Sequence, residues 1–121
     1  MLDEVHAALG TSDTSFVVCR DGRDVSRAIT QRTPDLAVLD LQCGSMGAMA
    51  VTMDLRLDHS DGRSPMVPVL MLLDRVADVH LAKRSGAQGW LIKPLDSLRL
   101  RRAADAIVAG KNWHEGVPVE V

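Results

Sequence analysis

The sequence predicts an α/β fold in which helices cover both faces of a doubly wound parallel sheet. Short runs that are apolar throughout alternate along the chain with segments whose apolar residues recur every three to four positions. Continuous apolar runs are typical of strands buried on both faces, and alternation of strands with helices is typical of parallel sheets. The length of 121 residues suits one such domain, which we expect over residues 1–121.

The apolar pattern places the individual elements in order along the chain. A first helix is predicted over residues 1–9, which Gly10 ends. The predicted strands comprise residues 16–19, 36–40, 67–73 and 89–92. The other predicted helices lie between Gly22 and Pro34, over 46–57, from Val76 to Ala82 and over 95–109. The tail 112–121 is predicted to be a loose end.

The core of this fold is expected to be aliphatic, because aromatic residues make up only 2% of the chain and hydrophobic residues 46%. In the helix predicted over 46–57, Met49, Met53 and Leu57 recur at four-residue spacing. With Ala50 and Val51 beside them, this spacing favours a helix.

Charge and hydropathy exclude several classes of function. The formal net charge of −2 provides no overall field that would attract nucleic acid or an acidic membrane surface. The longest apolar run, residues 66–73, is too short for a membrane helix. Asp3 and Glu4 stand where a signal peptide would carry basic residues. We therefore expect a cytoplasmic protein that binds neither nucleic acid nor membranes.

Two charged residues follow predicted strands and are candidates for a site. Asp40 ends the strand over 36–40, and Lys93 follows the strand over 89–92. The carboxyl ends of parallel strands meet at one edge of the sheet, which is where ligands bind in open α/β folds. An ammonium beside a carboxylate could hold a phosphoryl group there, although a solvated or simply paired lysine is the alternative. Pro94 fixes the backbone after Lys93 and is a candidate for a cis peptide bond.

Four segments of the chain carry a resemblance to a known family. They are Pro-Asp-Leu-Ala-Val-Leu-Asp-Leu at 34–41, Met-Gly at 46–47, Pro-Val-Leu-Met at 68–71 and Gly-Ala-Gln-Gly-Trp-Leu-Ile-Lys-Pro at 86–94. In this order and spacing, the chain from about Gly10 to Gly110 resembles the receiver domains of bacterial two-component response regulators. The resemblance implies a flavodoxin-like fold and a signalling protein that is not an enzyme in itself.

The resemblance also implies roles for individual residues. Asp40 would be the phosphoryl acceptor, Lys93 its ion-pair partner, and Trp90 the aromatic side chain whose rotation reports phosphorylation. For Trp90, an ordinary core or interface aromatic is the alternative. The implied partner is a histidine kinase or another signalling protein.

The chain departs from the family at several positions. The family's first strand, with the acidic pair that holds magnesium, would precede the helix over 1–9, but the sequence begins with that helix. A Mg²⁺ ion would then have Asp40 and a backbone carbonyl near Gln42, an incomplete set of protein ligands. Leu73 stands at the switch position where the family has Ser or Thr, and Asp74 replaces a small residue.

The missing strand predicts a homodimer. In the receiver fold this strand lies between the strands predicted at 16–19 and 36–40, so its absence leaves backbone groups facing a gap. Unpaired buried backbone groups cost about 1 to 3 kcal/mol each. The gap could close by direct pairing of the two strands, which would uncover apolar helix surface, or by a strand or helix borrowed from a second copy. Either route favours a homodimer.

Three functional hypotheses remain from the sequence. The first is a single-domain receiver in a phosphorelay, degenerate in its metal site, with Asp40 as acceptor. The second is a pseudo-receiver that acts as a protein interaction module independently of phosphorylation. The third is a small enzyme of flavodoxin-like architecture, which is disfavoured because the chain contains no complete catalytic set.

Overall fold

A parallel sheet forms the centre of the molecule. The computed structural model describes residues 2–10, 14, 17, 19, 22–40, 47–60, 62 and 66–115. Within them, four parallel strands lie in the order β1-β2-β3-β4. They are β1 (Ala37–Asp40), β2 (Val69–Leu73), β3 (Gly89–Ile92) and β4 (Trp113–His114).

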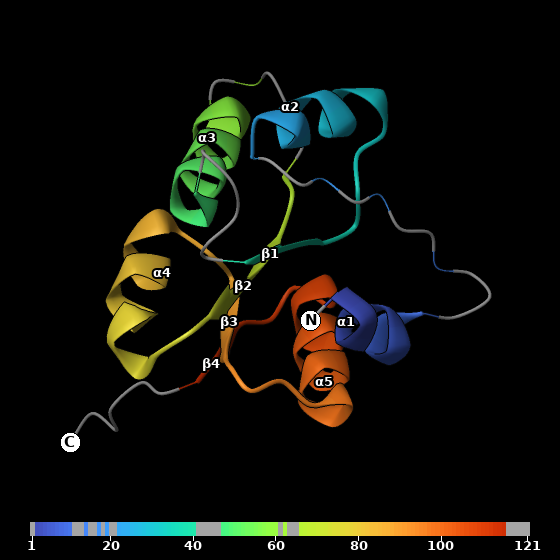
Figure 1. Cartoon of the computed structure of the whole chain (residues 1–121). Helices are drawn as coiled ribbons and strands as arrows, with labels where there is room; N and C mark the ends of the chain where they lie inside the picture. Colours follow the sequence, from blue (N-terminus) through green and yellow to red (C-terminus); the bar gives the residue numbers. More distant parts are fainter. Residues whose placement is uncertain are drawn as a thin grey trace.

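Helices cover both faces of this sheet (Figure 1). The helices are α1 (Leu2–Leu9), α2 (Gly22–Gln31), α3 (Ala48–Ser60), α4 (Val79–Ser85) and α5 (Ser97–Val108), with a 3₁₀ turn, η1 (Val76–Asp78), before α4. Figure 1 shows α1 and α5 on one face, and α2, α3 and α4 on the other. The predicted α/β fold with a parallel, doubly covered sheet is therefore confirmed.

The central strand β2 explains why this layering is stable. All five of its residues are buried, and they alternate between two apolar clusters. Val69, Met71 and Leu73 pack with α2, α3 and α4, whereas Leu70 and Leu72 pack with α1 and α5. Side chains that alternate across a strand reach both faces, so an entirely apolar strand is stable only between two helical layers.

The face of α3 that meets the sheet is not the one that carries Met53 and Leu57. Met53 and Leu57 are 50% and 57% exposed, whereas Val51, Thr52 and Leu55 are buried. The helix carries apolar residues around most of its circumference, so the spacing of apolar residues alone does not determine which of them face the core. Packing against β2 and the neighbouring helices decides which of these residues are buried.

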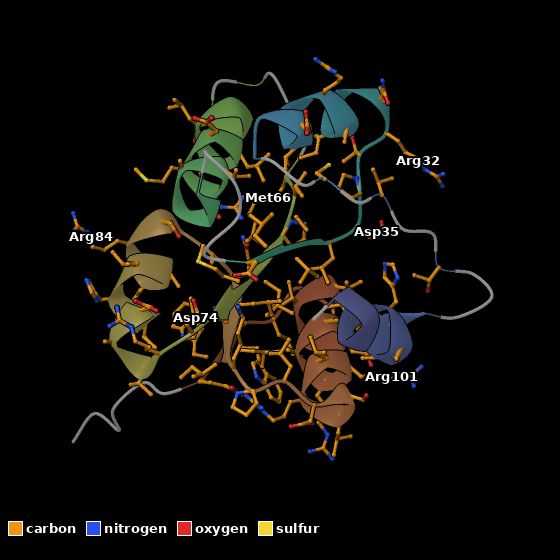
Figure 2. The ribbon with its side chains drawn as sticks, in the orientation of Figure 1. Arg32, Asp35, Met66, Asp74, Arg84 and Arg101 are labelled. Atoms are coloured by element: carbon orange, nitrogen blue, oxygen red, sulfur yellow. The ribbon has the colours of Figure 1, made fainter. Side chains whose placement is uncertain are left out.

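Arg56 then fixes α3 to the amino-terminal edge of the sheet. Its guanidinium donates to the carbonyl of Val67 just before β2 at 3.1 Å and to the carbonyl of Gly86 at 3.1 Å. It also donates to the side-chain carbonyl of Gln88 at 2.6 Å, and that oxygen accepts the backbone N–H of Val69 at 2.8 Å. Met66, labelled in Figure 2, lies against the same guanidinium. These bonds hold the edge of the sheet opposite to the candidate site.

The two ends of the predicted sheet differ from expectation. Of the strand predicted over 16–19, Val17 and Cys19 are described and lie outside any strand, whereas Phe16 and Val18 lie outside the described residues. At the other end, the predicted loose tail is wrong for Trp113 and His114, which form β4 beside β3. Tertiary contacts along β3 order this segment, and the apolar pattern of the tail contains no signal for them. Residues 116–121 lie outside the described part of the chain.

None of the helices in the described segments is both long and apolar enough to cross a membrane.

Candidate functional site

Three charged side chains meet at the carboxyl edge of the sheet. Asp40 is the last residue of β1, Asp74 follows β2, and Lys93 follows β3. The Nζ atom of Lys93 lies 3.1 Å from each carboxylate oxygen of Asp40 and 2.8 Å from Oδ1 of Asp74. Because the three strands are parallel and adjacent, each contributes one charged residue to the same place. Figure 2 labels Asp74 in this group.

Lys93 remains protonated across the physiological range. Partial burial lowers the pKa of its ammonium, but hydrogen bonds to Asp74 and Asp40 and the charges of both carboxylates outweigh that effect, so the pKa is raised above its ordinary value. The side chains of Lys93, Asp40 and Asp74 are 25%, 24% and 31% exposed. Water therefore screens the pairs, and the group is accessible to a small ligand.

The loop that carries Lys93 has a defined backbone. The Lys93–Pro94 peptide bond is cis, at the proline that the sequence singles out. The guanidinium of Arg99, on α5, donates to the carbonyls of Ile92 and Pro94 at 2.9 Å each. Asp96 caps α5 by accepting the N–H of Arg99 at 2.9 Å. Contacts on both sides of Lys93 thus hold the ammonium in place.

The first predicted switch position, Leu73, lies in the core. Its side chain is fully buried at the end of β2 and packs in the cluster under α3 and α4. It faces Ile92 of β3 in the sheet register. A leucine has no hydroxyl group, so this position cannot donate a hydrogen bond to a ligand at Asp40.

The second predicted switch position, Trp90 on β3, is held by the C-terminal segment. Its side chain is only 1% exposed. The indole N–H donates to the backbone carbonyl of Glu115 at 2.8 Å, and the ring stacks on His114 with centroids 4.2 Å apart and planes 8° from parallel. Trp90 is therefore a buried core aromatic with a specific polar partner.

The donor set at this edge fits a magnesium ion only in part. Carboxylate oxygens suit Mg²⁺, which proteins commonly hold through one or two carboxylates together with phosphate oxygens of a substrate. Asp40 and Asp74 supply two carboxylates, but both already contact the ammonium of Lys93. No three acidic, histidine or cysteine side chains of the described residues come together as a metal-binding group. Gln42, whose backbone is the other predicted ligand, lies outside the described residues.

The contacts that Glu115 makes near this site were not predicted from the sequence. Its carboxylate accepts the Nε–H of Arg99 at 3.0 Å, an Nη2–H of the same guanidinium and the N–H of Ile92 at 3.3 Å. Burial raises the pKa of Glu115. Hydrogen bonds from Arg99, Ile92 and Trp113, together with the charge of Arg99, lower it by more, so the pKa of Glu115 lies below its ordinary value. A lone glutamate in a polar tail has no sequence signal for such a role.

Comparisons with known proteins define the class of the chain. No family model matches it. It is 34% identical over 94 residues to the regulatory protein LuxO of Vibrio cholerae, a match that covers 74% of this chain and 19% of LuxO. It is 31% identical over 123 residues to the regulator of RpoS of Escherichia coli, a match that covers 99% of this chain and 34% of that protein. The chain thus spans about a third or less of the length of these relatives.

A solved structure matches this chain over most of its length. The signal receiver domain of the response regulator NarL from Mycobacterium tuberculosis superposes with a TM-score of 0.75 at 26% sequence identity, covering 90% of this chain and 87% of that one. The resemblance to the receiver domains of two-component response regulators is therefore confirmed, in fold and in sequence.

The geometry predicts how Lys93 contributes to stability. Lys93→Met keeps the apolar stem of the side chain and removes the charge. Because the pairs are partly exposed, we expect a loss of about 1 kcal/mol or less, which is a few degrees in Tm at pH 7. A raised pKa means that the contribution is complete below the pKa of an unfolded lysine, about 10.4, and is lost as the pH rises through the folded value. The difference in Tm between the parent and Lys93→Met should therefore shrink at strongly alkaline pH.

Thermal unfolding followed by circular dichroism at several pH values checks this expectation. Lys83→Met, at an exposed position on α4, is the matched control and should change Tm little at any pH. A loss above about 3 kcal/mol at pH 7 would instead mean that Lys93 is essential to the packing of the sheet.

Proposed function

We propose that this chain is a receiver in a two-component phosphorelay, with Asp40 as the phosphoryl acceptor. The observation that carries the proposal is the contact between Lys93 and Asp40 at 3.1 Å, at the carboxyl edge of a receiver-type sheet. A carboxylate there can attack the phosphorus of a donor such as a phosphohistidine of a kinase. The new P–O bond forms at Asp40 as the P–N bond of the donor breaks. Lys93 is placed to offset charge on the phosphoryl oxygens.

Two residues beside Asp40 are expected to make this reaction slow. Leu73 offers no hydroxyl group to an incoming phosphoryl group. Asp74 shares the ammonium of Lys93 at 2.8 Å and adds a second negative charge where the phosphoryl oxygens would lie. A Mg²⁺ ion held by Asp40 would supply further charge neutralisation. With the carboxylates that the described residues provide, we propose that this ion is bound weakly.

A second candidate function is supported by the same residues. With Lys93 already paired to two carboxylates and Trp90 held by Glu115 and His114, the fold is stable without a phosphoryl group. A pseudo-receiver would then act as a protein interaction module whose surface does not change on phosphorylation. In either case the partner is another signalling protein in the cytoplasm, and the chain performs no catalytic turnover of its own.

Labelling with acetyl phosphate separates the two candidates. With magnesium present, we expect the parent chain to gain one phosphoryl group slowly, and Asp74→Ala to gain it about tenfold faster, because Lys93 then has one carboxylate partner. A tenfold change in rate corresponds to about 1.4 kcal/mol, which is reasonable for one partly exposed like charge. Intact-mass measurements over time give the rates.

Two controls accompany this experiment. Asp40→Asn should abolish labelling, and Asp105→Asn, at an exposed position on α5, should leave the rate of the parent unchanged. Rapid and complete labelling of the parent would show that Leu73 and Asp74 do not impair the site. The absence of labelling in both the parent and Asp74→Ala would favour the pseudo-receiver.

We also propose that the chain forms a homodimer. Within the described residues, β1 has a strand on one side only, namely β2. A second copy could add a strand on the other side of β1 and pair with its backbone N–H and C=O groups. Light scattering coupled to size exclusion should give about twice the monomer mass of 13.1 kDa at micromolar concentration. A stable monomer over the whole concentration range would contradict this proposal.

A further inference from the structure

Arg99, on α5, has an acceptor for every N–H group of its side chain. A guanidinium carries five N–H groups. Nε and Nη2 donate to the two carboxylate oxygens of Glu115. Nη2 also donates to the carbonyl of Ile92, and Nη1 donates to the carbonyl of Pro94 and, at 3.2 Å, to the carboxylate of Asp96. Five hydrogen bonds to four residues thus fix the orientation of this side chain.

The backbone that Arg99 binds is the one that carries Lys93. Ile92 and Pro94 are the residues directly before and after Lys93, and the guanidinium bridges their carbonyls at 2.9 Å each. The N–H of Ile92 donates to the carboxylate of Glu115 at 3.3 Å. The N–H of Lys93 itself donates to the carbonyl at the end of β2 at 2.8 Å. The base of the Lys93 side chain is therefore held from β2 on one side and from α5 on the other.

The place of the Lys93 ammonium depends on this backbone. The side chain is 25% exposed, and the stem of a lysine is flexible. The carboxylates that it contacts, Asp40 and Asp74, follow two other strands. The distances from Nζ to their oxygens are therefore set in part by where the base of the Lys93 side chain lies relative to β1 and β2. Such placement matters for chemistry, since a misplacement of about 1 Å can slow a reaction about 100-fold.

Glu115 has contacts of a different kind from those of the strand before it. β4 pairs its backbone with β3, and its histidine ring stacks on Trp90. Glu115 follows β4, and its carboxylate is directed to Arg99 and to the N–H of Ile92. Backbone pairing and ring stacking are enough to cover β3 and require no carboxylate. The bonds of this side chain thus have a second effect, which falls on the base of Lys93.

We propose that Glu115 is a positioning residue for the ammonium of Lys93 and that it acts through Arg99. The carboxylate aligns the guanidinium, and the guanidinium fixes the carbonyls on both sides of Lys93. The backbone then places Nζ in contact with both Asp40 and Asp74. The consequence for acceptor chemistry at Asp40 rests on the proposed function, whereas the placement of the ammonium does not.

Two substitutions separate positioning from charge. Glu115→Gln removes a negative charge and keeps the size of the side chain. Arg99→Lys keeps the positive charge but lacks the planar group that reaches several acceptors at once. If these residues acted by charge alone, phosphoryl labelling of Asp40 would become faster in Glu115→Gln and stay unchanged in Arg99→Lys. Positioning predicts slower labelling in both variants.

NMR relaxation of the ε-methylene group of Lys93 tests the placement without any phosphoryl donor. It reports how freely the end of the side chain moves in the folded protein. We expect a lower order parameter in Glu115→Gln and in Arg99→Lys than in the parent, because the base of the side chain is held less firmly. The exposed Lys83 on α4 should keep its value in all three proteins. Circular dichroism verifies that each variant is folded well below its Tm, so a loss of stability alone does not produce this result.

Labelling with acetyl phosphate and magnesium tests the effect on the acceptor. The measurement is made in the Asp74→Ala background, where labelling is expected to be faster. Glu115→Gln and Arg99→Lys should each slow it at least about threefold. The two substitutions together should be no slower than the slower single one, because both act through the same guanidinium. Intact-mass measurements over time give the rates.

Two control variants make the same chemical changes elsewhere on α5. Asp105→Asn removes an exposed negative charge, and Arg101→Lys replaces an exposed guanidinium, which Figure 2 labels. Both should leave the order parameter of Lys93 and the labelling rate as they are in the parent and in the Asp74→Ala background.

Each result decides the proposal. Unchanged order parameters for Lys93 in both variants would overturn it, whatever the labelling rates. Faster labelling in Glu115→Gln with an unchanged rate in Arg99→Lys would also overturn it and assign the effect to charge. Lower order parameters in a chain that no donor labels would support the positioning role and contradict the proposed function of Asp40.

Discussion

The ammonium of Lys93 between two carboxylates is the interaction on which the candidate site depends. It requires three parallel strands in adjacent positions, because Asp40, Asp74 and Lys93 each lie at the end of a different strand. The two-sided burial of β2 fixes those positions, since its alternating side chains pack both helical layers. The charged edge is thus a direct consequence of the apolar core beneath it.

The two ion pairs also bear on what the candidate site can bind. With one carboxylate, Lys93 would be available to a phosphoryl group at Asp40. With two, its charge is more than balanced before any ligand arrives. On the proposed function we therefore expect Asp74 to decide between a working acceptor and a stable structural element, and the fully buried Leu73 beside it supplies no polar group to change that balance.

Arg99 links the candidate site to the C-terminal segment, residues 113–115. Its guanidinium donates to the carbonyls of Ile92 and Pro94, on either side of Lys93, and to the carboxylate of Glu115. A change in the backbone that carries Lys93 would alter the same hydrogen-bonding group that holds this segment. The two regions are therefore connected through a single side chain on α5.

Much of this arrangement could be predicted from the sequence, and the reasons for the failures are physical. Continuous apolar runs indicate doubly buried strands, so β1, β2 and β3, both helical layers and the placement of Asp40 and Lys93 at one edge followed from local pattern. The buried face of α3 did not, because Met53 and Leu57 form an equally regular stripe and only packing against β2 excludes it. The position of residues 113–115 could not be predicted either, because it depends on contacts of Glu115 with Trp90 and Arg99, which lie 25 and 16 residues earlier in the chain.

The central claim is that Asp40 and Asp74 share the charge of Lys93, and an NMR titration of the Lys93 side chain tests it most directly. The chemical shifts of its ε-methylene group, followed with pH in the parent, Asp40→Asn and Asp74→Ala, report its pKa in each. The account predicts a pKa above the ordinary value of about 10.4 in the parent and a lower one when either carboxylate is removed. An ordinary pKa that is the same in all three proteins would contradict it.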